Sequence, residues 1–104
     1  MARFDVYANP DANERKVVPY LLDVQNDYLH GLETRVVIPL RSASLLQLRA
    51  KGLNPELEVT GKAVVMETAA IGAIPISELR RPVANLLRDQ RTIQDALDTL
   101  FGSH

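Results

Sequence analysis

The 104-residue chain contains no cysteine and no tryptophan, and its only histidines stand at positions 30 and 104. Disulfides and thiolate chemistry are therefore excluded, and a zinc site with the usual cysteine and histidine spacing is not expected. The five glycines form neither GxGxxG nor GxxxxGK[ST], the two glycine-rich patterns that bind phosphates. We therefore expect no metal, no cofactor and no enzymatic activity.

Long hydrophobic runs are also missing. No apolar stretch approaches the roughly 18–20 residues of a membrane span, and the opening MARFDVYANP lacks the apolar segment of a signal peptide. Twelve basic against thirteen acidic residues leave a formal charge of −1. This balance gives no electrostatic reason to expect direct binding to nucleic acid. The sequence predicts a cytoplasmic protein with no membrane association.

The residues that are present make an ordinary globular composition, 46% hydrophobic, which suits one domain over residues 1–104. Short alternating or β-branched runs between turn residues predict strands at 3–8, 17–25, 34–40, 57–60 and 63–68, with 69–76 as a further strand or packed connection. Gly61-Lys62 suits a two-residue II′ hairpin turn. Residues 42–51 are compatible with a short helical turn that Ser42 caps and Gly52 ends.

From Leu86 onward the apolar spacing becomes helical. One helix face would hold Leu86, Ile93, Ala96, Leu97, Leu100 and Phe101. Asn85 is a plausible N-cap, and Gly102 is expected to end the helix. The predicted class is β-rich α+β, a small barrel or curled antiparallel sheet with a C-terminal amphipathic helix covering one face.

Apolar residues also occupy positions that are typical of the surface. Tyr28 and Leu29 lie in the connection between two predicted strands, and Phe101 lies at the helix end. Aromatic and aliphatic side chains on loop tips and helix ends favour a protein-recognition patch. The alternatives are that Phe101 completes the core-facing stripe and that Tyr28 packs back onto the sheet. Asp23 and Asp27 are better explained as turn-capping residues than as an acid–base pair.

Several segments resemble the CcdB family of toxins, in the order and spacing that the family shows. They are Phe4-Asp5-Val6-Tyr7, Leu22-Asp23-Val24-Gln25-Asn26-Asp27, Arg35-Val36-Val37-Ile38-Pro39-Leu40, Ala73-Ile74-Pro75-Ile76 and Ile93-Gln94-Asp95-Ala96-Leu97-Asp98. The resemblance implies a homodimer built on an SH3-like barrel with a C-terminal helix. It also implies binding to the A subunit of DNA gyrase, trapping of the cleaved-DNA complex, neutralisation by a CcdA-type antitoxin, and a role in plasmid maintenance.

Carried over by position, the gyrase-binding residues of the family become Tyr28, Leu29, Asp98, Phe101, Gly102, Ser103 and His104. The sequence departs from the family at Gly102, where well-known members carry tryptophan. Either gyrase binding is altered here, or Gly102-Ser103-His104 derives from an expression vector. Two other hypotheses stay open: a degenerate toxin that dimerises and binds antitoxin without poisoning gyrase, and an endoribonuclease like the related MazF and Kid proteins. For the antitoxin, the loop at residues 9–16 is one candidate surface.

Overall fold

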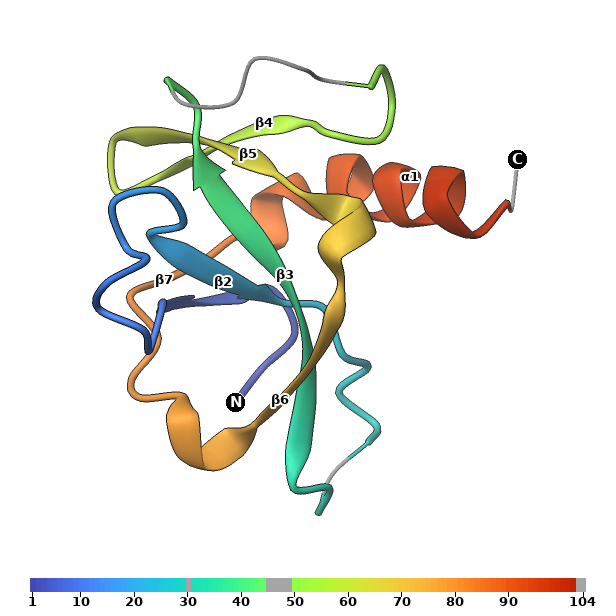
Figure 1. Cartoon of the computed structure of the whole chain (residues 1–104). Coiled ribbons are helices and arrows are strands. Elements are labelled where there is room, and N and C mark those ends of the chain that lie inside the picture. The colour runs from blue at the N-terminus through green and yellow to red at the C-terminus, as the bar shows by residue number, and fades with distance from the viewer. Residues whose placement is uncertain (30, 45–49, 103–104) are drawn as a thin grey trace.

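The computed structural model describes residues 1–29, 31–44 and 50–102 (Figure 1). The elements are β1 (Asp5–Ala8), β2 (Tyr20–Asp23), β3 (Thr34–Ser42), β4 (Glu56–Val59), β5 (Lys62–Met66), β6 (Gly72–Pro75), β7 (Ala84–Asn85) and α1 (Gln90–Phe101). Short 3₁₀ turns lie at η1 (Thr68–Ala70), η2 (Ile76–Glu78) and η3 (Leu87–Asp89). In the part of the chain that the structure describes, no helix is both long and apolar enough to cross a membrane.

All strands pair antiparallel in one sheet. Six of them follow the order β4-β5-β3-β2-β1-β7, and β6 pairs with β3 outside this path. The nine-residue strand β3 organises this sheet, because the two halves of one edge pair with different partners. Its beginning pairs with β6, its end pairs with β5, and β2 runs along the other edge. The sheet curls into a nearly closed barrel, and α1 packs against it (Figure 1). The predicted β-rich α+β class with one C-terminal helix is confirmed.

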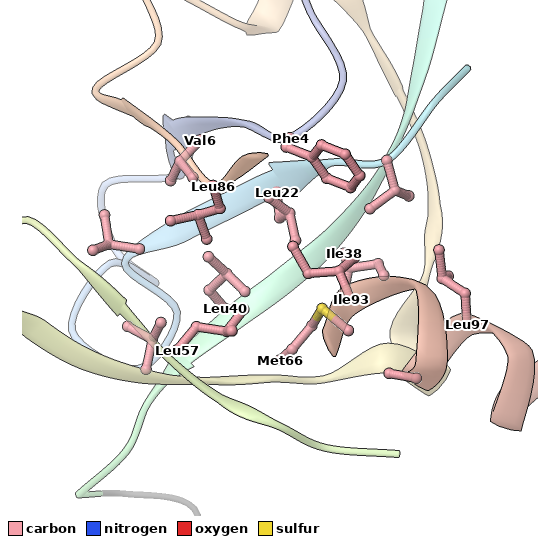
Figure 2. Packing of buried hydrophobic residues seen from close by; sticks show 14 residues of the cluster. Phe4, Val6, Leu22, Ile38, Leu40, Leu57, Met66, Leu86, Ile93 and Leu97 are labelled. Atoms are coloured by element: carbon pink, nitrogen blue, oxygen red, sulfur yellow. The ribbon is translucent and has the colours of Figure 1, made fainter. Parts of the chain in front are cut away.

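The main hydrophobic core lies between the curled sheet and α1. Figure 2 shows side chains from the strands converging on the helix residue Ile93, which is fully buried. The buried members are Phe4, Val6, Leu22, Val24, Ile38, Leu40, Leu57, Val59, Val64, Met66, Leu86, Ile93, Ala96 and Leu97. Burial of this apolar area is the main force that holds the helix to the sheet.

A second, smaller cluster covers the opposite face of the sheet. It consists of Tyr7, Leu21, Val37 and Leu79. Successive side chains of a strand point to opposite faces, so Val6 enters the main core while its neighbour Tyr7 enters the smaller one. Strands β1 to β3 are therefore buried on both faces, which also places Asp23 in the interior.

The C-terminal helix begins later than the sequence predicts. Asn85 Oδ1 accepts a hydrogen bond from the backbone N–H of Leu87 and so opens the 3₁₀ turn η3, while the α-helix itself starts at Gln90. The predicted end is confirmed: Gly102 adopts the left-handed conformation at φ 80°, and its N–H donates to the carbonyl of Asp98.

Three local predictions need correction. The β4–β5 hairpin turns at Thr60-Gly61, since Val59 pairs with Lys62, and both turn residues have positive φ (49° and 84°), as in a I′ turn rather than II′.

Ser42 is the last residue of β3 and therefore does not cap a helix. The predicted helical turn that follows falls largely on residues 45–49, which lie outside the described residues. The strand predicted at 17–25 is only Tyr20–Asp23, and β7 was not predicted.

Candidate functional site

The connection between β2 and β3 carries the two apolar side chains that the sequence singled out. Tyr28 is 87% exposed and Leu29 is 50% exposed. The alternative in which Tyr28 packs back onto the sheet is therefore wrong. Nearly the whole phenol ring faces solvent. The side chain therefore contributes little to the stability of its own fold.

Hydrogen bonds to Asn26 and Asp27 restrain residues 26–29 of this loop. Asn26 Oδ1 accepts from the N–H of Tyr28 at 2.9 Å, and the Asn26 carbonyl accepts from the N–H of Leu29 at 3.0 Å. Asp27 Oδ1 accepts from the backbone N–H of Arg3 at 2.7 Å. The exposed tip is thus preorganised, which lowers the entropy lost when such a tip binds a partner.

A buried ion pair forms the base of the same loop. Arg35 donates from Nε to Asp23 Oδ2 at 2.7 Å and from Nη2 to Asp23 Oδ1 at 2.9 Å, and both residues are buried. Asp23 Oδ1 also accepts from the N–H of Gln25. These hydrogen bonds to Asp23 raise the pKa of Arg35 above its ordinary value. Asp23 therefore acts as a structural anion, in agreement with the turn-capping interpretation.

Tyr7 is the titratable group next to this pair. Burial, followed by the negative charges of Asp5 and Asp23, raises the pKa of Tyr7 to about 12. Within the described residues its hydroxyl makes no hydrogen bond of acceptable geometry. A phenol with this pKa stays protonated at neutral pH and offers no general base.

The end of α1 presents the second group of predicted site residues. Phe101 is 68% exposed, so the alternative in which it completes the core stripe is wrong. Asp98, half-buried, accepts from Gln94 Nε2 at 3.0 Å. A Cβ on Gly102 would meet no described atom within 4 Å, yet its φ of 80° disfavours any other residue. Ser103 and His104 lie outside the described residues.

The two groups extend toward the same side of the molecule, with the loop in cyan and the end of α1 in red on the right of Figure 1. An open cavity of about 410 Å³ lies beside Tyr28, between the loop, the N-terminal segment and η3. Arg3 and the 56% exposed Leu87 line it together with Tyr28. Over the described ranges, no cluster of three or more His, Cys, Asp or Glu side chains is arranged to hold a metal ion.

The family model of the CcdB protein matches residues 3–102 of the chain. The chain belongs to the CcdB family. Membership in this family implies that the protein is the toxin of a toxin–antitoxin system. Both exposed groups, the Tyr28-Leu29 tip and the end of α1, lie within the matched residues up to Gly102.

Sequence reasoning did not find every residue that shapes this surface. Arg3 donates hydrogen bonds to the carbonyl of Val24, where the loop begins, and to Gln94 on α1, and Leu87 adds exposed apolar area beside Tyr28. Neither residue stands in a recognisable motif. Their role depends on contacts between segments far apart in the chain, which a local pattern does not reveal.

Proposed function

We propose that this CcdB-family protein binds the A subunit of DNA gyrase and traps the complex in which gyrase has cleaved DNA. It acts as a homodimer in the cytoplasm, catalyses no reaction itself, and is neutralised by a CcdA-type antitoxin. The observation that carries this proposal is the exposure of Tyr28 and Phe101, two large aromatics that the family resemblance assigns to gyrase binding.

The proposed mechanism is a shift in the populations of gyrase conformations. A ligand shifts such an equilibrium only by its difference in affinity for the two states. An aromatic side chain buries about 150–250 Å² when it enters a partner's pocket, and at about 25 cal/mol per Å² this gives about 4–6 kcal/mol before the costs of association. A pocket that accepts Tyr28 or Phe101 only in the cleaved-DNA state would supply that difference.

For the antitoxin we propose the loop between β1 and β2, at residues 9–16. Its shape is fixed at the base, because Asn9 Nδ2 donates to the carbonyl of Val18 and Arg15 Nε donates to the carbonyl of Asn9. Its outer residues, Asp11 to Lys16, are exposed and carry charges of both signs. A flexible antitoxin segment with its own mixed charges would find a preformed surface here.

A single set of reactions tests the proposal. The purified protein is incubated with gyrase, supercoiled plasmid and ATP, and linear DNA is measured after detergent and protease treatment, with an RNA substrate in parallel. We expect linear DNA that disappears when a CcdA-type antitoxin is added. RNA fragments without linear DNA would instead indicate an endoribonuclease, and antitoxin binding without either product would indicate a degenerate toxin.

The homodimer is tested separately by light scattering or analytical ultracentrifugation over a range of concentrations. A particle of twice the 11.6 kDa chain mass is expected. A single-copy particle at the concentrations that trap gyrase would contradict the dimeric form of the proposal.

A further inference from the structure

We propose that Arg3 is a positioning residue that ties the Tyr28-Leu29 loop to helix α1, so that the two exposed groups are presented at a fixed separation. The consequence for gyrase binding rests on the proposed function. The coupling between the loop and the helix does not, because it is a property of the free protein.

On the loop side, Arg3 makes two contacts. Its backbone N–H donates to Asp27 Oδ1 at 2.7 Å, and its side-chain Nε donates to the carbonyl of Val24 at 3.2 Å. Val24 stands just after β2, where the loop begins, and Asp27 directly precedes Tyr28. Arg3 therefore holds the loop at its root and next to its tip.

On the helix side, Nη2 of Arg3 donates to Gln94 Oε1 at 3.0 Å, and Gln94 Nε2 donates to Asp98 Oδ1 at 3.0 Å. Gln94 and Asp98 are one helical turn apart and therefore lie on the same face of α1. The amide of Gln94 accepts from the cation and donates to the carboxylate, so its dipole is aligned with both neighbours. One series of hydrogen bonds thus runs from Asp27, through Arg3 and Gln94, to Asp98 in the last turns of α1.

Arginine suits this position better than lysine. The guanidinium presents several N–H donors in a rigid planar fork, so Nε and Nη2 can serve two acceptors in different directions at once. The guanidinium carbon also lies 4.8 Å from the centroid of the Phe4 ring, a cation–π arrangement that restrains the side chain further. A lysine ammonium is a single point on a flexible stem and would hold one acceptor at a time.

The backbone beneath Arg3 is itself fixed. Phe4 has a positive φ of 73°, a rare conformation for a bulky residue. It is held there by its buried ring and by two backbone hydrogen bonds, from its N–H to the Asp23 carbonyl and to its carbonyl from the Leu86 N–H. Arg3 thus projects from a rigid point between the loop and the helix.

The competing explanation is that Arg3 contacts the partner directly, since the side chain lines the open cavity beside Tyr28. Two substitutions separate these cases. Arg3→Met removes the guanidinium and keeps an apolar stem over Phe4. Gln94→Met leaves Arg3 in place but removes its acceptor on the helix. Arg88→Met is the matched control, because Arg88 also bonds a distant carbonyl, that of Glu58, without contacting the loop.

The first measurement uses the free protein and ¹⁵N NMR relaxation. We expect the backbone order parameters of Tyr28 and Leu29 to fall in Arg3→Met and in Gln94→Met, with no change in Arg88→Met and none for core amides such as that of Leu22. Unchanged order parameters at Tyr28 and Leu29 in both variants would overturn the coupling.

The second measurement is the affinity for the gyrase A subunit by calorimetry. Arg3→Met and Gln94→Met should each weaken binding by about 3- to 30-fold. The double variant should bind no more weakly than the single variant with the larger loss, because both substitutions remove the same link. A loss in Arg3→Met alone, with Gln94→Met binding normally, would make Arg3 a direct contact and overturn the positioning role. If the unmodified protein does not bind gyrase but both variants loosen the loop, the proposed function fails and the coupling stands.

Discussion

Replacing Tyr28 and Leu29 together by serine is expected to weaken gyrase binding strongly and to leave the fold nearly as stable as before. The expectation follows from where the two side chains lie. Tyr28 is 87% exposed and Leu29 is 50% exposed. Their apolar surface is therefore mostly in contact with water in the free protein, and little of it supports the core.

The two magnitudes differ enough to be separated. Full burial of a leucine is worth about 1.5–3 kcal/mol, so the half-buried Leu29 contributes about 1 kcal/mol to the free energy of unfolding. Tyr28 is mostly exposed and adds little to this. Truncation of a central interface residue costs about 2 kcal/mol or more in binding, about 30-fold in Kd. Losses at adjacent residues need not add, so the double variant should bind between about 30-fold and about 1,000-fold more weakly, while its free energy of unfolding falls by about 1 kcal/mol.

The assay pairs urea denaturation with calorimetric titration of the gyrase A subunit. Val83→Ser is the matched surface control, because Val83 is 46% exposed and lies directly before β7 rather than in the loop. Leu22→Ala is the core control, since Leu22 is fully buried and such a truncation costs about 2–5 kcal/mol.

Two results would refute the reasoning. A loss of stability in the Tyr28→Ser, Leu29→Ser variant as large as that in Leu22→Ala would mean that the two side chains support the fold. Gyrase binding equal to that of the unmodified protein, or weakened as much by Val83→Ser, would mean that the loop tip is not a specific contact.

Three further predictions concern stability. Arg35→Met should lower the free energy of unfolding in urea by about 3–5 kcal/mol, because it leaves the buried charge of Asp23 unpaired; a near-neutral result would show that Asp23 is solvated. Phe101→Ala should change stability by less than about 1 kcal/mol, in keeping with its 68% exposure, and should weaken gyrase binding by about 30-fold in the same titration; a large loss of stability would contradict that exposure. Tyr7→Phe should be neutral or stabilising at pH 7, because the buried hydroxyl makes no hydrogen bond of acceptable geometry within the described residues. Since the pKa of Tyr7 is about 12 in the folded protein and about 10 when unfolded, the unmodified protein should lose up to about 3 kcal/mol of stability relative to Tyr7→Phe between pH 10 and 12. Parallel pH curves for the two proteins would refute the raised pKa.

The element types could be predicted where a local pattern decides them. The helix stripe is one example: Ile93, Ala96 and Leu97 are buried as their spacing predicted. Gly102 is another, because ending a helix in a left-handed residue needs only the glycine itself. These features depend on neighbours in the chain, and the sequence shows those directly.

Pairing between distant segments could not be read from the sequence. The hairpin turn was misplaced by one residue, because Thr60-Gly61 and Gly61-Lys62 both contain the glycine and only the register of β4 on β5 separates them. The strand β7 has two residues and is stabilised by its pairing with Asp5 and Val6, so it carries no pattern of its own.

The same distinction between local and distant contacts applies to the candidate surface. Tyr28 and Leu29 could be predicted as exposed because a polar connection surrounds them. The role of Arg3 could not, because its acceptors are Val24 and Gln94, the second of them 91 positions away. A surface assembled from the beginning, the first third and the end of a chain leaves no single motif to recognise.

The pairing of β1 with β7 also bears on when the fold is completed as the chain is made. Asn85 Nδ2 donates to Asp5 Oδ1 across 80 positions of sequence, beside the backbone pairing of the same two residues. Contacts of such long range form late and slowly. A ribosome-bound chain that has not yet released β7 and α1 lacks both the strand that pairs with β1 and the helix to which Arg3 donates a hydrogen bond. The surface that the Tyr28-Leu29 loop and α1 form can therefore be completed only after the residues of α1 have left the ribosome.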